Sequence, residues 1–244
     1  MLSNSLIQIQ SALLPVLTED GTWFQNPAIQ QLLWPAVWET LLMVFVSTFA
    51  TVLLGLPLGV FLSETRKGGL IASPTINRIT GILVNLGRAI PFIILAIIVL
   101  FAIRAIDLPW LRAIGWPAFT IALVVSAVPY FARLVESNLL SVEHGKVEAA
   151  QMMGASRMRI MTGVLVREAL PSIIQSITIL AITIIGYSAM APAVGAGGLG
   201  ALAINYGYQR YKFDVIFIVV VIILILVQIV QMIGDMLSRL VDHR

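Results

Sequence analysis

The chain has 244 residues, of which 59% are apolar and only 11% are charged, and its mean hydropathy is +0.98. A soluble domain needs a far more polar surface, so this composition indicates an integral membrane protein. The net charge of +3 does not indicate a nucleic-acid partner, because the cations are scattered among loops and form no basic stripe. The absence of cysteine excludes disulfides and thiolate chemistry.

Residues 1–33 are expected to form an external N-terminal segment ahead of the first span. This segment has neither the positively charged start nor the small-residue cleavage site of an export signal. A short amphipathic segment at the outer membrane surface is the favoured interpretation, and a disordered segment is the alternative.

Three uncharged intervals are long enough to cross a membrane as helices, since a crossing needs roughly 20 apolar residues. They contain 24, 20 and 20 residues and cover Thr40–Ser63, Ala113–Ala132 and Val215–Gly234. The first interval contains Gly55 and Gly59, and this spacing permits the close approach of another helix. That helix belongs either to the same chain or to a second copy of it.

A fourth span is predicted around a shorter uncharged interval. Ala89–Ile103 has only 15 residues, so a helix there must extend back through Arg88 to about Ile79. Pro91 is expected to kink this helix. Arg88 then lies in or near the hydrocarbon, where it either snorkels to the inner surface or pairs with a carboxylate.

The remaining span lies in a stretch of 41 uncharged residues, Ala169–Gln209, which is too long for one crossing. We expect a helix over about 171–190, followed by a Gly-rich non-helical stretch over 193–200 and a short polar segment. The sequence therefore predicts an all-α membrane protein with five transmembrane helices.

The positions of Lys and Arg predict the orientation, because cytoplasmic loops carry an excess of these residues. Residues 1–65 contain none, which places the N-terminus outside and, after five spans, the C-terminus in the cytoplasm. Eleven of the fifteen cations then lie on the inner side: Arg66, Lys67, Arg78, Arg88, Arg133, Lys146, Arg157, Arg159, Arg167, Arg239 and Arg244.

The longest charged loop, residues 136–170, is cytoplasmic in this topology. Within it, 147–153 has helix-forming residues, Gly154 suits a left-handed C-terminal cap, and Ser156 can cap a second helix. The first helix carries small and adaptable apolar side chains suited to a groove on another protein: Ala149, Ala150, Met152 and Met153. A loop helix packed under the bundle is the alternative.

Two features of the sequence resemble known importers. The string Glu148-Ala149-Ala150-x3-Gly154 resembles the coupling loop in membrane subunits of ABC-type importers. From about residue 34 onward the chain is similar to the methionine-uptake permease group, through three strings: Val37-Trp38-Glu39-Thr40-Leu41, Arg88-Ala89-Ile90-Pro91-Phe92-Ile93-Ile94-Leu95, and Gly186-Tyr187-Ser188-Ala189-Met190 with the following Ala193–Gly200. The sequence departs from the pattern at Arg167, where importers have Pro, and at Ala191-Pro192, where Gly-Gly is expected.

The resemblance implies a type I ABC importer permease fold over residues 34–244, in a bacterial inner membrane, with methionine as the solute. It implies that the ATPase-coupling residues are Glu148, Ala149, Ala150, Met153 and Gly154. It also implies that the pathway and gate residues are Arg88, Pro91, Tyr187, Ser188 and Met190, with Met190 as the outer gate. The implied partners are a second copy of the chain, two ATPase subunits and an external binding protein.

The chain itself is expected to be non-catalytic and to carry no cofactor. It has no G-x-x-x-x-G-K-[ST] phosphate cradle, so ATP and Mg are assigned to the ATPase partner. With only His144 and His243 it offers no credible metal cluster. Its carboxylates lie at or outside span boundaries, which weighs against a proton-coupled carrier. The alternatives are a permease for another small amino acid or osmolyte, and a carrier or channel that works alone.

Overall fold

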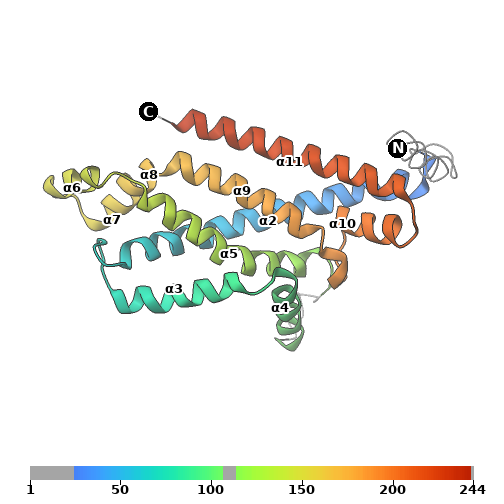
Figure 1. The fold of residues 1–244 in the computed structure, drawn as a ribbon, viewed down its shortest axis with the longest axis horizontal. Coiled ribbons are helices and arrows are strands. Elements are labelled where there is room, and N and C mark those ends of the chain that lie inside the picture. The colour runs from blue at the N-terminus through green and yellow to red at the C-terminus, as the bar shows by residue number, and fades with distance from the viewer. Residues whose placement is uncertain (1–24, 107–113, 243–244) are drawn as a thin grey trace, which may run out of the picture.

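The computed structural model describes residues 25–106 and 114–242, and within these ranges it contains helices and no strands (Figure 1). The predicted all-α membrane fold is confirmed. Four helices are long and apolar enough to cross a membrane: α2 (Pro27–Thr65), α5 (Trp116–Leu140), α9 (Leu170–Ser188) and α11 (Phe213–Val241). A fifth crossing is obtained when α3 (Pro74–Ala89) and α4 (Phe92–Ile106) are counted as one broken span.

The first helix begins earlier than its uncharged interval suggested. Asn26 caps it, since its side-chain oxygen accepts a hydrogen bond from the Ala28 amide at 3.0 Å. The Asn26 side-chain nitrogen also donates to Asp214 Oδ2 at 2.9 Å, which joins the starts of α2 and α11. Helix α2 therefore starts inside the expected external segment 1–33, of which residues 1–24 lie outside the described part of the chain.

Helices α2 and α5 form the central pair of the bundle, and they meet at two glycines. A Cβ on Gly55 would come within 2.9 Å of Phe131 Cδ1. A Cβ on Gly59 would come within 2.6 Å of Val135 Cβ and 2.7 Å of the Ala132 carbonyl oxygen. The sequence left open whether the helix that approaches Gly55 and Gly59 belongs to the same chain or to a second copy. In the structure it is α5 of the same chain.

The predicted kink at Pro91 is a complete break. Helices α3 and α4 meet at 104°, so the chain turns through more than a right angle where a single bent helix over 79–103 was expected. Ile90 is extended, with φ −75° and ψ 126°, because the ring of a following proline disfavours the helical conformation. The direction of α4 is then set by packing on α5.

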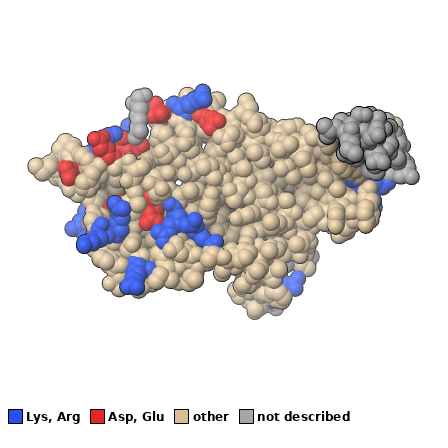
Figure 2. Space-filling view, in the orientation of Figure 1, with Lys and Arg blue, Asp and Glu red and all other residues tan. Residues whose placement is uncertain are grey.

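The long helices lie roughly side by side along the long axis of the molecule, and the two ends of the bundle differ (Figure 1). One end carries the short helices α6 (His144–Met152) and α7 (Arg157–Ile160), and the opposite end carries α10 (Leu199–Ala201). Figure 2 shows that on this face most charged side chains gather around the α6 and α7 end, while the middle of the surface is largely uncharged. This distribution matches a membrane protein with one strongly charged aqueous face.

We predict that Gly59→Ala destabilises the protein by about 1–3 kcal/mol, because the added methyl group forces α2 away from α5. Gly163→Ala is the matched control, since no atom lies within 4 Å of a Cβ built at Gly163. Thermal unfolding of the purified protein in detergent measures both. Equal unfolding temperatures for the two variants would contradict the close packing of α2 and α5.

Candidate functional site

The charged loop folds as predicted into a helix, a glycine turn and a second helix. Helix α6 ends in a Schellman motif, in which the Gly154 amide donates to the Gln151 carbonyl at 2.9 Å and the Ala155 amide donates to the Ala150 carbonyl at 3.1 Å. Gly154 has φ +75°, a left-handed conformation that costs a residue with a Cβ about 1–2 kcal/mol. The glycine therefore fixes the angle at which the chain leaves α6.

The second half of the loop continues directly into the span α9. Ser156 caps α7 by accepting from the Arg159 amide at 3.4 Å. A π-helical segment, η2 (Met161–Leu165), and the short α8 (Val166–Glu168) follow. Arg167 thus lies in α8 immediately before α9 begins, and the missing proline leaves the helical path almost unbroken.

Four of the five predicted coupling residues are exposed, namely Glu148, Ala149, Met153 and Gly154. Ala150 is the exception: it is only 5% exposed and packs in the hydrophobic core beneath α6. The expectation that α6 presents Ala150 at its surface is therefore not met in the single chain, and its part in coupling stays a prediction. The apolar groups that α6 presents to water are Met152 at 90% and Met153 at 82% exposed.

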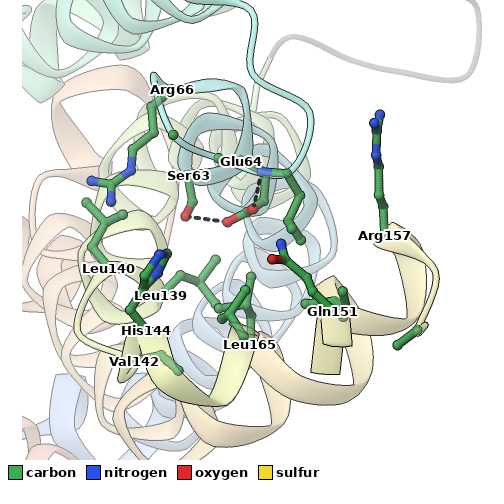
Figure 3. Close-up of a pocket in the computed structure, with 16 residues that line it drawn as sticks. Ser63, Glu64, Arg66, Leu139, Leu140, Val142, His144, Gln151, Arg157 and Leu165 are labelled. Atoms are coloured by element: carbon green, nitrogen blue, oxygen red, sulfur yellow. Dashed lines mark hydrogen bonds between the residues drawn. The ribbon is translucent and has the colours of Figure 1, made fainter. Parts of the chain in front are cut away.

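A cavity of about 410 Å³ separates the coupling loop from the end of α2 (Figure 3). Its lining includes Arg66, Gln151 and Arg157, together with the buried carboxylate of Glu64. Glu64 Oε1 accepts from Ser63 Oγ at 2.9 Å, and Oε2 accepts from the Leu70 amide at 3.2 Å. Glu64 therefore holds the loop after α2 in place beside the coupling helices.

At the opposite end, α9 terminates in the predicted gate segment. The chain leaves α9 through a 3-10 helix, η3 (Ala191–Val194), and then reverses at Gly195, which has φ +77°. Pro192 lies in the first turn of η3, where its missing N–H costs nothing. Met190 is 44% exposed, whereas Ser188 is buried and donates to the Ile185 carbonyl at 2.7 Å. Ser188 therefore stabilises the end of α9 and does not face solvent.

Beyond the turn, the Gly-rich stretch is bound to the N-terminal half of α2. Glu39 Oε2 accepts from the Gly198 amide at 2.8 Å, and Thr40 Oγ1 accepts from the Leu199 amide at 2.9 Å. These two amides lead into α10 and the π-helix η4 (Leu202–Tyr208), so they have no partner inside the helix. We refer to these two hydrogen bonds as the α2 latch.

The glycines of the latch leave room for the α2 side chains. A Cβ at Gly197 would overlap Glu39 Oε2, and a Cβ at Gly198, which has φ +90°, would lie 2.8 Å from Thr40 Oγ1. The predicted non-helical stretch 193–200 is correct for 195–198, while helix resumes at Leu199. The latch was missed because its partners are 159 residues apart. The available signal was a Glu-Thr pair near a span end together with the consecutive glycines.

The remaining predicted pathway residues meet at the corner between α3 and α4. Arg88 lies in the last turn of α3, and Pro91 occupies the break. Tyr187 stacks on Phe92, the first residue of α4, with ring centroids 4.4 Å apart and planes within 3°. Arg88 is 14 residues from Pro74, or about 21 Å along the helix, which is too far to snorkel back to the charged loop before α3.

The described residues contain no group of three or more His, Asp or Glu side chains arranged to hold a metal ion. Among the described residues, Arg133 and Glu136 form a largely buried ion pair on α5, and Lys146 pairs with Glu168 near the surface. His144 Nε2 lies 3.6 Å from Glu148 Oε1 on the exposed side of α6. The geometry offers surfaces and a gate segment, and the described part shows no constellation typical of bond chemistry.

Comparison with known proteins relates this architecture to transport proteins. Residues 55–244 match the family described as binding-protein-dependent transport system inner membrane component. The probable D-methionine transport system permease protein MetI of Vibrio cholerae serotype O1 is 46% identical over 213 residues, which cover 87% of this chain and 93% of the relative. The methionine import system permease protein MetP of Bacillus subtilis is 40% identical over 226 residues, covering 91% and 98%.

Solved structures give the same relationship. A chain of the inward-facing MetNI methionine ABC transporter superimposes with a TM-score of 0.86 at 42% identity, covering 90% of this chain and 100% of the other. A chain of an amino acid ABC transporter with histidines superimposes with a TM-score of 0.69 at 18% identity, over 84% and 92% of the two chains. The second likeness supports the fold alone.

We predict that Thr40→Val loosens the Gly-rich stretch, because it leaves the buried Leu199 amide without an acceptor. Such a loss costs about 1–3 kcal/mol, or roughly fivefold to 150-fold in local opening. Hydrogen exchange of peptides covering 198–208 measures it.

Thr48→Val is the matched control for this experiment, since the buried Thr48 hydroxyl on the same helix has no hydrogen-bond partner within the described residues. If both variants exchange at the wild-type rate, the α2 latch does not hold the stretch in place.

Proposed function

The chain belongs to the family of binding-protein-dependent transport system inner membrane components, and on that premise we propose that it forms the translocation pathway for methionine in an ATP-driven importer. It is a multi-pass permease subunit of a bacterial ABC transporter in the cytoplasmic membrane. Methionine as the solute is supported by the names of relatives at 40–46% identity over most of the chain.

The observation that carries the proposal is the exposed apolar tip of α6. Met152 and Met153 are 90% and 82% exposed at the charged end of the bundle, where flexible thioether side chains suit a groove on another protein. We assign this tip to a separate ATPase subunit that binds ATP and Mg, so that hydrolysis takes place on the partner. The α6 end is then cytoplasmic, and the α10 end faces outward.

The assembly proposed is a homodimer of this chain with two ATPase subunits and an external binding protein. Helices α3, α4 and α11 present large apolar side chains that the described residues leave exposed, including Leu83 at 63%, Phe101 at 65% and Leu224 at 61%. Such faces suit contact with lipid or with a second copy of the chain. In a dimer with a two-fold axis, the gate segments of the two copies come together. Solute released by the binding protein enters at this outer end.

The mechanism follows from the connection between the two ends. ATP binding draws the ATPase subunits together and moves both α6 tips. Because α2 packs closely on α5 and carries the latch to the Gly-rich stretch, the motion reaches the gate segment as a rigid-body rotation. Met190 forms the outer gate, and Tyr187, Arg88 and Pro91 line the pathway below it. Ser188 stabilises the end of α9, which carries Tyr187.

Reconstitution tests the proposed function. Vesicles containing the permease, the ATPase subunit and the binding protein are predicted to accumulate radiolabelled methionine only when ATP is supplied to the ATPase side. Vesicles containing the permease alone serve as the reference. Uptake at the same rate without any ATPase subunit would show a carrier or channel and would refute the importer.

We predict that Gly154→Val uncouples ATP hydrolysis from uptake by at least about tenfold, since a β-branched residue strains the left-handed turn that aims α6. Gly145→Val, at the start of α6, is the control, because Gly145 is not left-handed and a Cβ built there has no atom within 4 Å. Both hydrolysis and uptake are measured on reconstituted complexes. A Gly154→Val complex with the wild-type ratio of transport to hydrolysis would rule out this role for the turn.

A further inference from the structure

A second cavity, smaller than the one beside the coupling loop, lies at the corner where α3 breaks into α4. It has a volume of about 140 Å³, and its walls come from α3, α4, α5 and α9. The side chains that matter to its chemistry are Arg88, Phe92, Ser126, Tyr130 and Tyr187. Drug-sized sites begin at roughly 300 Å³, so this cavity suits a much smaller solute.

Arg88 is the one charged group in this lining. Arg88 is exposed in the single chain, and within the described residues it makes no ion pair and no hydrogen bond. A guanidinium group matches a carboxylate with two parallel hydrogen bonds. The cavity therefore has a fixed positive charge whose natural counterpart is absent from the described chain.

The lining of this cavity also contains an aromatic pair. The Phe92 ring stacks face to face on the Tyr187 ring, with the ring centroids 4.4 Å apart. It makes a T-shaped contact with the Phe119 ring, with the centroids 5.7 Å apart. Such rings favour an apolar or thioether group, because sulfur interacts well with aromatic edges. Polar atoms beside them come from Ser126 and Tyr130, which suit an ammonium group.

The frame that holds Arg88 is rigid. Gly87, next to it, allows α3 to approach α5 so closely that a Cβ there would lie 2.8 Å from Pro129 Cγ. One turn and a half earlier, the Gly81 carbonyl accepts a hydrogen bond from Arg133 Nη2 at 3.0 Å. Arg88 is thus presented from a helix whose backbone is fixed at two points, so ligand binding has to order its side chain but not the helix.

We propose that this cavity is a binding site for an α-amino acid within the permease, in which Arg88 pairs with the carboxylate and the Phe92–Tyr187 pair contacts the side chain. The inference rests on the proposed function and adds to it a site of stated chemistry along the pathway. It also explains why a charged residue lies at the helix break, where an apolar residue would be cheaper to insert.

The test uses the purified permease–ATPase complex in nanodiscs, without the binding protein. Equilibrium binding of radiolabelled methionine is compared with that of methionine carboxamide, which lacks the carboxylate charge. The wild-type complex is expected to bind methionine about tenfold or more tightly than the amide in at least one nucleotide state, as for other charge-assisted hydrogen bonds. In Arg88→Gln, the two ligands are expected to bind equally and weakly.

Arg78→Ala is the matched control, an exposed arginine on the same helix that lines neither cavity, and it is expected to keep the wild-type preference. Tyr187→Phe is expected to retain most of the affinity, and Phe92→Ala to reduce it for both ligands alike. Absence of binding by the wild-type complex, or an unchanged preference in Arg88→Gln, would overturn the site.

The two proposals fail differently in these measurements. Loss of ATP-dependent uptake by the wild-type complex would contradict the importer function itself. Normal uptake combined with no preference for the carboxylate would contradict only the Arg88 site. Because the comparison of methionine with its amide can be made on the wild-type complex, it does not depend on how any variant folds.

Discussion

The close contact of α2 with α5 determines how the two ends of the molecule relate. Gly55 and Gly59 remove the side chains that would separate the helices, so the pair behaves as one body across the bilayer. Helix α2 is 39 residues long, about 58 Å, and is therefore longer than the membrane is thick. Its ends reach both aqueous sides, and each end holds a segment that the proposed transport cycle has to move.

At the N-terminal end of α2, Glu39 and Thr40 bind the backbone of the Gly-rich stretch, and at its C-terminal end Glu64 binds the loop beside the coupling helices. In each case a side chain satisfies backbone amides that the chain's own helices leave free. An unpaired polar group in an apolar environment costs free energy, so these hydrogen bonds favour one position for each of the segments that they hold. Helix α2 thus holds the proposed gate at one end, and its close packing on α5, the helix that precedes α6, links it to the proposed ATPase-facing tip.

Local sequence signals predicted the features that depend on neighbouring residues. The left-handed Gly154 and the cap at Ser156 define the helix–turn–helix of the coupling loop, and uncharged intervals locate the spans. Features that depend on distant contacts were predicted less well. The 104° break at Pro91 depends on packing against α5, the latch joins residues 159 apart, and the burial of Ala150 depends on which face of a nine-residue helix meets the core.

The central claim is that the α6 tip moves together with the opposite end of the bundle, which carries the gate segment, the α2 latch and η4. Because the chain has no cysteine, single spin labels can be placed at Met153→Cys and, separately, at Tyr208→Cys, both at exposed positions. In the reconstituted complex, the distance between the spin labels on the two copies is then measured by electron–electron double resonance, with and without a non-hydrolysable ATP analogue. The account predicts that the nucleotide shifts both distances. A shift between the Met153 labels with no change between the Tyr208 labels would contradict it.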